Sequence, residues 1–438
     1  MENKRYDGYY NAVIGHGLHS RDPGQHWKYS FTELMSDQLL ADMYSGNGLA
    51  RRIVDLPADE AVKNWITLST PDENTNSLML GMLDDLNAEM HFADAIRWAR
   101  LYGGSLLLLL VNDGGTLQEP LQKDRIRYVD SLKVYDRTEV TWNYADLYTD
   151  PQNPKFGSPE FYEITPVTGN TFRVHESRTF KFIGAPIPHR YNLYYQNWGM
   201  PVLQGLMEDI RNCNVGYKNA GLLLERISQA IYKITDLGAM LETSEGEELV
   251  MKRIQLIDMA RSILNTIVID MGEDFDLKNT SLAQVPQILD QFGVMVAGLS
   301  GIPYTLLFGT SPAGMNATGE SDLENYYNLV RQIQKRQMKK PLDTLVQLLF
   351  LSREGPFRGR EPEDWKLEFM PLWLPSEKEK AETEKLYAET DRIKSETAKN
   401  YVDAGALDPS EVRKKLSEEK AYDIEGELDE MLEDEPEV

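Results

Sequence analysis

The sequence predicts an α+β protein, on three observations. Apolar residues recur at helical spacing in the stretch from residue 31 to residue 102. From 125 to 183 the chain consists of short runs rich in β-branched and aromatic residues, separated by Asp, Asn, Gly and Pro, which is typical of strands and turns. Two long helical segments, 201–228 and 281–308, then enclose a smaller stretch of strand-like composition.

Composition favours a soluble globular protein. The 438 residues suffice for about two to four domains, and a hydrophobic content of 41% can build real cores. A single cysteine, Cys213, excludes an intramolecular disulfide and a Cys-rich zinc site. The first residues lack the apolar core of a secretory signal, and the longest apolar run, Leu106–Val111, is far shorter than the roughly 20 residues that span a bilayer. We expect a protein made in the cytoplasm, with no membrane partner.

The charge is strongly negative and unevenly placed. The net charge is −24, and the segment Ala421–Val438 contains nine acidic residues and no Lys or Arg. We expect this tail to be a solvated terminus. Tight general binding of DNA needs Lys and Arg to displace counterions, so the overall sign argues against it. A surface that DNA slides past without sticking remains compatible with this charge.

The first third of the chain is expected to hold an arm and two helical stretches. Residues 1–30 are polar and rich in turn formers. Helical periodicity begins at Phe31, and Pro57 is expected to break or restart that helix. Gly46–Gly48 is half of a dinucleotide-binding fingerprint, but it lies between helical stretches and is interpreted as a turn. A second helix is predicted over 77–102.

Strands follow that helix. Gly103 and Gly104 are expected to end it, and the apolar run after them predicts a buried strand ending near Asp113. The strands of 125–183 complete an α+β unit that is expected to end near Trp198 and Gly199.

The second half begins with the two long helical segments. Pro201 stands in the first turn of the helix 201–228, where proline is tolerated. The stretch 229–280 predicts a small β-α-β insertion: a strand, a helix, a strand that begins at residue 265, and after an acidic turn a second, weaker strand. In the helix 281–308 Asp290 is the only charged residue. Three glycines at small-residue spacing would let a neighbouring helix approach closely: Gly293, Gly298 and Gly301.

A loop of small, nearly uncharged residues follows at 309–321. Because it has little apolar surface to bury, we expect a ligand or an open channel to set its composition. A basic helix is predicted over 322–350, interrupted at Pro341. A linker, a strand within 365–373 and a charged helical region from Ser376 complete the chain.

No catalytic machinery is recognisable, so we expect neither an enzyme nor a cofactor nor a metal site. There is no Walker A phosphate loop and no nucleophile elbow. Leu106–Asp113 looks like a Walker B strand, but a buried strand and its turn is the favoured reading. His16, His19 and His26 lack acidic neighbours at ligand spacing, which leaves a metal site a remote alternative to a plain arm. Cys213 is read as a core or interface thiol.

The order of these elements resembles the portal proteins of tailed bacteriophages. The resemblance rests on Pro201-Val-Leu opening a long helix after Trp198-Gly199, and on the segment from Phe292 to Leu342, with its Gly-Ile-Pro, Leu-Leu-Phe-Gly and Asn-Ala-Thr-Gly-Glu-Ser-Asp runs. It covers most of the chain and is strongest over 199–350. It is distributed along the chain and contains no single sharp motif.

This resemblance implies a homo-oligomeric ring, usually a dodecamer, at one capsid vertex of the virion. Double-stranded DNA would pass through its channel during packaging and ejection, without sequence preference. The implied partners are the large terminase, the major capsid or scaffold protein, and a head–tail adaptor or tail protein. The implied portal fold has an α/β wing (1–200), stem helices (201–228 and 281–308), a small β-α-β clip (229–280), a tunnel loop (309–321), a kinked tunnel helix with a wing and crown junction (322–375) and a helical crown with the acidic tail (376–438).

Two candidate sites follow from the resemblance. The tunnel loop would face DNA through small side chains that contact phosphates weakly; its candidate residues are Ser311, Pro312, Ala313, Gly314, Met315, Asn316, Ala317, Thr318 and Gly319. The basic stripe of the next helix faces DNA, forms salt bridges between subunits or is a solvated helix face, and these alternatives stay open; its residues are Arg331, Lys335, Arg336, Lys339 and Lys340.

Two other function classes remain as alternatives. Another oligomeric head–tail connector or minor capsid protein, without a translocation role, would share the acidity and the lack of catalytic residues. An enzyme that uses Gly309–Ser321 to cradle a phosphate is disfavoured, because no Lys or metal-binding carboxylate stands at the spacing of a phosphate loop.

Overall fold

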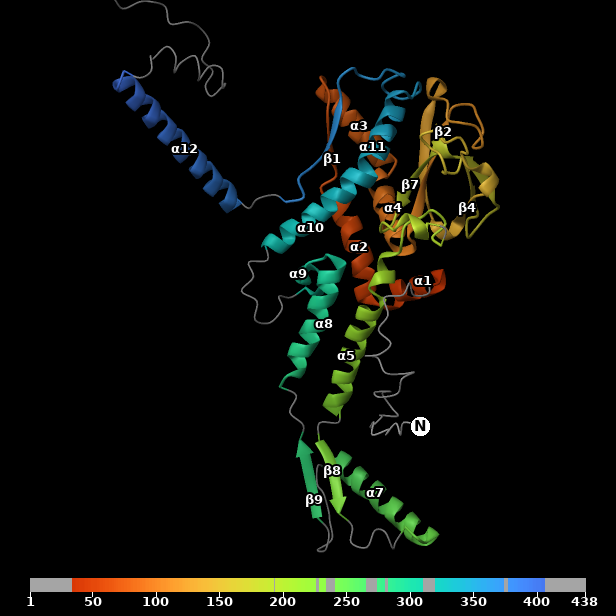
Figure 1. Ribbon diagram of the computed structural model, residues 1–438, viewed down its shortest axis with the longest axis vertical. Helices are drawn as coiled ribbons and strands as arrows, with labels where there is room; N and C mark the ends of the chain where they lie inside the picture. The colour runs from red at the N-terminus through yellow and green to blue at the C-terminus, as the bar shows by residue number, and fades with distance from the viewer. Residues whose placement is uncertain are drawn as a thin grey trace, which may run out of the picture. The chain divides into compact units, whose positions relative to one another are not determined.

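The computed structural model of the chain has the predicted α+β composition (Figure 1). The residues that it describes are 34–192, 194–225, 228–233, 241–264, 274–279, 283–309, 320–373 and 377–405. The predicted N-terminal arm and the acidic tail lie outside these ranges. The chain divides into two compact units, Met1–Leu372 and Trp373–Val438.

Two helices open the first unit, α1 (Asp37–Gly46) and α2 (Gly48–Val62). The turn predicted at Gly46–Gly48 is confirmed. Asn47 connects the helices and caps α2, since its side-chain oxygen accepts hydrogen bonds from the backbone N–H groups of Leu49 (2.9 Å) and Ala50 (3.1 Å).

The break predicted at Pro57 is wrong, because α2 runs through this residue. Proline has no N–H, so the carbonyl of Ile53, one helical turn earlier, lacks its usual donor. Arg100 replaces that donor, since its guanidinium donates to the carbonyl oxygens of Ile53 (2.7 Å) and Val54 (3.1 Å). Burial lowers the pKa of Arg100 to about 10. A long-range hydrogen bond thus compensates a local helix breaker.

Two helices replace the single one predicted over 77–102: α3 (Glu73–Asp85) and α4 (Ala88–Tyr102). The chain turns at Asn87, whose φ of 49° lies in the left-handed region that asparagine tolerates. The predicted stop at Gly103 is confirmed, and its φ of 87° suits glycine.

Six strands of the first unit form two antiparallel sheets, and the strands predicted here are confirmed. The first sheet has the order β3-β2-β7, and the second has the order β4-β5-β6. The strands are β2 (Gly104–Asn112), β3 (Tyr128–Asp136), β4 (Val140–Thr141), β5 (Phe161–Ile164), β6 (Phe172–His175) and β7 (Thr179–Ile183). Alternate side chains of β2 enter two cores: Leu107 and Leu109 join the main core, and Leu106 and Leu108 pack in the cluster that contains Trp198.

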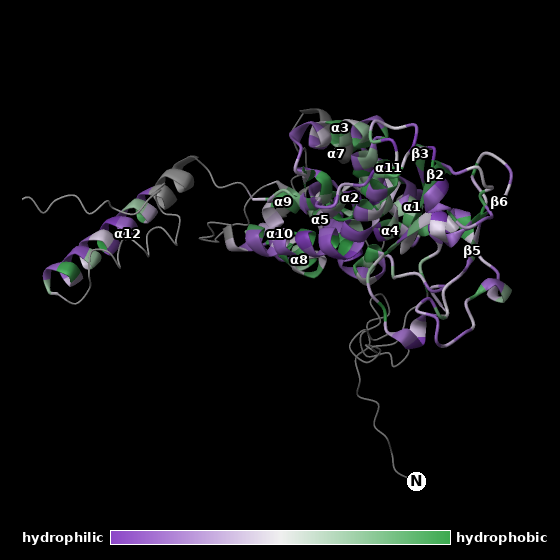
Figure 2. Cartoon of the chain, turned by 90° about the horizontal axis from the view of Figure 1, so that it is seen from above, coloured by the Kyte–Doolittle hydropathy of each residue, from purple (hydrophilic) through white to green (hydrophobic). Residues whose placement is uncertain are grey.

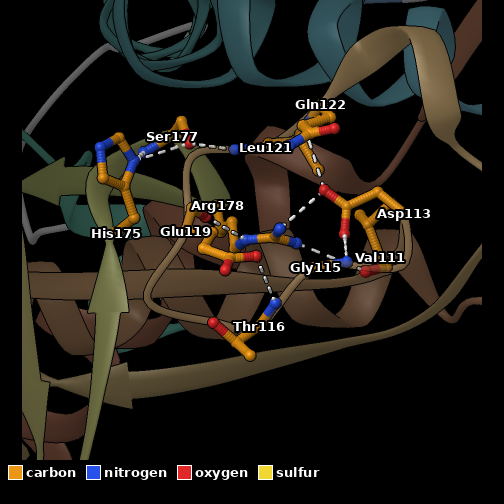
Figure 3. A network of polar contacts seen from close by, with 10 residues as sticks. All are labelled: Val111, Asp113, Gly115, Thr116, Glu119, Leu121, Gln122, His175, Ser177 and Arg178. Carbon is orange, nitrogen blue, oxygen red and sulfur yellow. Dashed lines mark hydrogen bonds and ion pairs between the residues drawn. The ribbon is translucent and has the colours of Figure 1, made fainter.

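Asp113 ends β2 in a buried ion pair, which confirms the reading of this segment as a strand and its turn (Figure 3). Its carboxylate accepts from the guanidinium of Arg178 (2.7 Å) and from the backbone N–H groups of Gln122 (3.0 Å) and Gly115 (3.1 Å). Burial alone would raise the pKa of Asp113, but these hydrogen bonds hold it below its usual range. The network fastens the loop after β2 to the start of β7.

The second half of the first unit begins with α5 (Met207–Glu225), shorter than the predicted 201–228 because a 3₁₀ turn occupies Val202–Gly205. The predicted first strand and helix are confirmed as β8 (Ser228–Lys233) and α7 (Ser244–Leu264), and the weaker last strand is confirmed as β9 (Asp274–Asn279). The strand predicted to begin at residue 265 lies outside the described residues. β8 and β9 pair with each other as an antiparallel ladder (Figure 1).

The single helix predicted over 281–308 is wrong. The structure has α8 (Val285–Ser300) and a separate short α9 (Tyr304–Phe308). Gly301 takes a left-handed φ of 69° and ends α8, and Pro303 cannot continue it. The signal for this stop, Gly-Ile-Pro, was present in the sequence.

The predicted basic helix is continuous from α10 (Glu320–Ile333) through a π-helical turn (Gln334–Met338) into α11 (Lys339–Phe350). The interruption expected at Pro341 is therefore wrong, and the irregularity lies one turn earlier. Lys339 donates its N–H to the carbonyl of Gln334, five residues back. Pro341 itself stands in the first turn of α11, where proline is tolerated.

The last elements lie in different units. β10 (Lys366–Phe369) pairs antiparallel with β1 (Ile66–Ser69) and closes the first unit. The second unit contributes α12 (Glu377–Asp403), a helix whose turns vary between hydrophilic and hydrophobic in Figure 2. Four of its large apolar side chains are exposed: Leu386, Tyr387, Ile393 and Tyr401.

Candidate functional site

The predicted tunnel loop can be located only through its two flanks. Its nine candidate residues, 311–319, lie outside the described residues, so their role stays a prediction. On one flank α9 ends at Gly309, whose N–H donates to the carbonyl of Thr305 (2.9 Å). On the other flank α10 begins at Glu320.

The first flank is packed around two glycines of facing helices. A Cβ on Gly216 of α5 would meet the ring of Phe292 of α8 at 3.2 Å, so this glycine lets α5 and α8 approach closely. A Cβ on Gly293 would meet Tyr304 at 2.8 Å, which makes room for α9 against α8. Gly298, in contrast, has nothing within 4 Å of such a Cβ. The predicted close approach therefore uses Gly293 and also Gly216, which the sequence analysis did not single out.

The helix pair α5 and α8 carries apolar stripes that no described residue covers. On α5, Val215 and Leu222 stand two turns apart on one face, with 47% and 41% of each residue exposed. On α8 the exposed stripe consists of Ile288, Met295 and Leu299. Met295 stands two helical turns after Ile288, and Leu299 stands one turn after Met295. In a chain by itself these stripes would contact water.

The second flank is anchored to the core by the π-helical turn. Gln334 is buried, and its side-chain amide donates to the carbonyl of Ala61 at the end of α2 (2.8 Å). Met338, one π turn later, is also fully buried. Tyr326 and Val330 continue the buried face along α10. The helix is thus fixed on one side, which leaves its other side to solvent.

The basic stripe splits into two groups. Four of its residues are exposed, and none of them has a carboxylate within 4.0 Å among the described residues: Arg331, Lys335, Arg336 and Lys340. Lys339 is half-buried, and its ammonium donates to Asp343 (2.9 Å) and to the carbonyl of Leu367 in β10 (2.5 Å). The spacing of Lys339 and Asp343 by four residues was a visible signal of this internal pair.

Other chemistry suggested by the sequence is not assembled in the described part of the chain. Among those residues no group of three or more His, Cys, Asp and Glu side chains could hold a metal ion. Cys213 is a buried thiol whose pKa is raised by burial. His16, His19 and His26 lie outside the described residues. In that same part of the chain, no helix is long and apolar enough to cross a bilayer.

Comparison with known families decides the class of this protein. The sequence model of the phage portal proteins, named Phage_portal_3, matches residues 38–393. The chain belongs to the phage portal protein family. The match includes both flanks of the loop and the helix 320–350, so the resemblance noted from the sequence is confirmed.

Curated relatives of this portal protein are longer than the chain. A Caulobacter sp. (strain RHG1) protein named "Anti-CBASS protein Acb1" is 29% identical over 394 residues, which cover 87% of this chain and 61% of the relative. A Sphingomonas paeninsulae protein of the same name is 27% identical over 401 residues, covering 88% and 62%. The chain thus spans about three-fifths of the length of these relatives.

Two solved structures match the chain at low sequence identity. In the neck of an empty GTA particle, a chain with 17% identity and a TM-score of 0.46 matches over 86% of this chain and 92% of its own length. An HK97 family phage portal protein from Corynebacterium diphtheriae has 9% identity and a TM-score of 0.38, over 77% of this chain and 98% of its own.

Proposed function

We propose that this portal protein forms a homo-oligomeric ring, a dodecamer, that conducts double-stranded DNA through one capsid vertex during packaging and ejection. The observation that carries the proposal is the pair of exposed apolar stripes on α5 and α8. A helix pair that buries only its shared face leaves such stripes in water, and a further helix layer is the ordinary way to cover them. Neighbouring copies supply that layer.

The two stripes lie on different helices, an arrangement that is compatible with a ring. The stripe of α5 contains Val215 and Leu222, and the stripe of α8 contains Met295 and Leu299. Because two different surfaces are available, one copy can present its α5 to the α8 of the next. Such head-to-tail contacts form a ring when the rotation between copies closes.

The DNA-facing part of the proposal rests on charge and on side-chain size. The exposed cations Lys335 and Arg336 have no carboxylate partner within their own chain among the described residues. The neighbouring loop 309–321 contains no Lys or Arg, so it would slide past phosphates with few salt-sensitive contacts. We assign the loop to the channel and the two cations to its wall, and we keep salt bridges between subunits as the competing assignment for the cations.

The parts of the ring follow the family order. We propose that residues 1–200 form the wing, that α5 and α8 form the stem, and that 229–280 form the clip. The helix 322–350 would be the tunnel helix, and 376–438 the crown. The partners would be the large terminase, the capsid or scaffold protein, and an adaptor or tail protein. In this proposal the protein has no chemistry of its own.

The name of the longer relatives suggests an anti-CBASS role, but no described residue cluster favours one for this chain. The match covers only about three-fifths of those relatives. We therefore keep the conduit as the proposed function.

The ring is tested by making the stripes polar. We expect the double substitution Leu222→Glu and Met295→Glu to shift purified protein from rings to single chains, as measured by mass photometry and by electron micrographs viewed down the ring axis. The matched control is Val167→Glu in an exposed loop, at a residue that is 92% exposed, and it should leave assembly unchanged. Rings that form normally in the double variant would remove the observation on which the proposal rests. Rings without a stem would favour a head–tail connector instead.

The DNA assignment is tested separately from assembly. Replacing Lys335 and Arg336 by Glu should reduce DNA retention in packaged particles while rings still form, because phosphate contacts are lost. If assembly fails first in this variant, the two cations belong to salt bridges between subunits.

A further inference from the structure

Lys181 of β7 is a partly buried cation with no acidic partner among the described residues. Its ammonium donates one hydrogen bond, to the carbonyl of Asn197 (2.9 Å). It lies over the ring of Trp198, 4.4 Å from the centroid, and 5.4 Å from that of Trp142. No carboxylate of the described residues lies within ion-pair distance of it. Loss of water on burial lowers the pKa of Lys181 to about 8.

This arrangement leaves hydrogen-bonding capacity unused. An ammonium has three donors, and a buried one is costly unless it is paired and hydrogen-bonded. The indole N–H of the adjacent Trp198 is also buried and has no acceptor among the described residues. Lys181 therefore has donors beyond its one hydrogen bond, and the neighbouring indole N–H of Trp198 has no acceptor among the described residues.

A pocket of about 230 Å³ opens beside Lys181, at the free edge of the sheet β3-β2-β7. This volume is several times the roughly 30 Å³ that one water molecule occupies in the liquid. Strand β7 and the start of α11 provide most of its wall. The lining residues are Tyr162, Glu176, Thr179, Phe180, Lys181, Lys340, Pro341 and Thr344.

The charges of this pocket favour an anion. Two lysines line it, Lys181 and Lys340, and Lys340 is an exposed residue of the basic stripe. The one acidic lining residue, Glu176, is already held by the ammonium of Lys155 (2.5 Å) and the hydroxyl of Tyr148 (3.4 Å). The negative charge of Glu176 is therefore compensated by Lys155, which is neither of the two lysines that line the pocket.

We propose that this pocket is a binding site for one oxyanion group, a carboxylate or a phosphate, held between Lys181 and Lys340. The group would accept a charge-assisted hydrogen bond from each ammonium. Lys181 is set back from the surface, which suits a single small group better than the wide backbone of a duplex. The group comes either from free phosphate or from an acidic side chain of a second copy. The site is independent of the DNA-conducting role.

The first arm of the test measures free phosphate. Equilibrium dialysis of the purified protein with radiolabelled inorganic phosphate should show one saturable site per chain. Lys340→Met should weaken binding about tenfold, the effect of losing one hydrogen bond to a charged group. The matched control Lys335→Met lies outside the pocket on the same exposed helix and should bind as the wild type does. Lys340 is exposed, so its loss should not disturb folding.

The second arm identifies a carboxylate from another copy. A zero-length carbodiimide joins an amine to a carboxylate only where they touch, so a site filled by a second copy gives an amide between Lys181 and an Asp or Glu of that copy. Mixing ¹⁴N and ¹⁵N protein tells such links from links within one chain in the mass spectrum. Saturable phosphate binding or a link between chains supports the proposal. Absence of both, equal loss in the Lys340→Met and Lys335→Met variants, or a link only to Glu176 of the same chain overturns it.

Discussion

Arg178 and Lys181 are two cations three residues apart, the first fully buried and the second partly buried, and their surroundings differ. Arg178 shares its charge with Asp113 (2.7 Å) and donates to the carbonyls of Glu119 (2.8 Å) and Val111 (3.4 Å). Lys181 has one carbonyl and two aromatic rings. A buried charge that is paired with a carboxylate and hydrogen-bonded to two carbonyls holds loops together. A partly buried charge with one hydrogen bond has donors left for a ligand, and the neighbouring groups distinguish the two cases.

The largest expected effect comes from removing Arg178, whose guanidinium bonds to Asp113 and to the carbonyls of Glu119 and Val111. Arg178→Met should lower the free energy of unfolding by about 3–5 kcal/mol, because it leaves the carboxylate of Asp113 buried and unpaired. Urea-induced unfolding followed by circular dichroism measures this. The double variant Arg178→Met with Asp113→Asn removes the stranded charge and should recover part of the loss. A cost below about 1 kcal/mol for the single variant would show that the pair does not hold this region.

An intermediate effect is expected at Arg100, a cation that bonds only carbonyls. Arg100→Met should cost about 1–3 kcal/mol, because the carbonyl of Ile53 loses its only donor. A double-mutant cycle with Pro57→Ala tests this reason, because alanine restores a backbone N–H one helical turn after the carbonyl of Ile53. The cost of Arg100→Met should then fall. If the same cost appears in both backgrounds, Arg100 stabilises the fold by packing and does not replace the missing donor.

The smallest effect at pH 7 is expected for Lys181→Met. The variant loses a cation–π contact but also removes a desolvated charge, so its free energy of unfolding should stay within about 1 kcal/mol of the wild type. The pH dependence of the free energy of unfolding tests the lowered pKa of Lys181. The unfolded chain holds the Lys181 proton up to its ordinary pKa of 10.5, whereas the folded chain releases it near 8. Between these values the unfolded state binds more protons, so the wild type gains stability relative to the variant as pH rises. Parallel curves in phosphate-free buffer would contradict the lowered pKa.

The strands and most helices were predictable because their signals are local. The continuous apolar run of β2 and the turn residues between the later strands indicated their positions directly. The errors arose where a distant group decides a local conformation. Nothing near Pro57 in the sequence indicates that Arg100 supplies its missing partner. The splits at Asn87 and Gly301 had local signals, and these were outweighed by the apolar periodicity on both sides.

The candidate site was predictable only in part. The exposed residues of the basic stripe could be predicted from helical spacing. The four-residue spacing of Lys339 and Asp343 in the sequence also indicated their ion pair. The residues of the loop, 311–319, stay a prediction. Lys181 could not be found from the sequence, because one lysine in an alternating strand is expected to point to solvent. Its burial depends on Trp142 and Trp198, which come from elsewhere in the chain.

The ladder between β1 and β10 has a consequence for how this chain is made. Ile66 pairs with Phe369, and Ser69 pairs with Lys366, so the partners stand near opposite ends of the first unit. A ribosome synthesises the two three-stranded sheets, α5, the strand–helix–strand insertion and the basic helix before β1 meets its partner. Contacts of such long sequence separation form late and slow folding. Until then β1 exposes an unpaired edge, a state open to pairing with other chains. Control over when the first unit closes would therefore also limit premature association of newly made subunits.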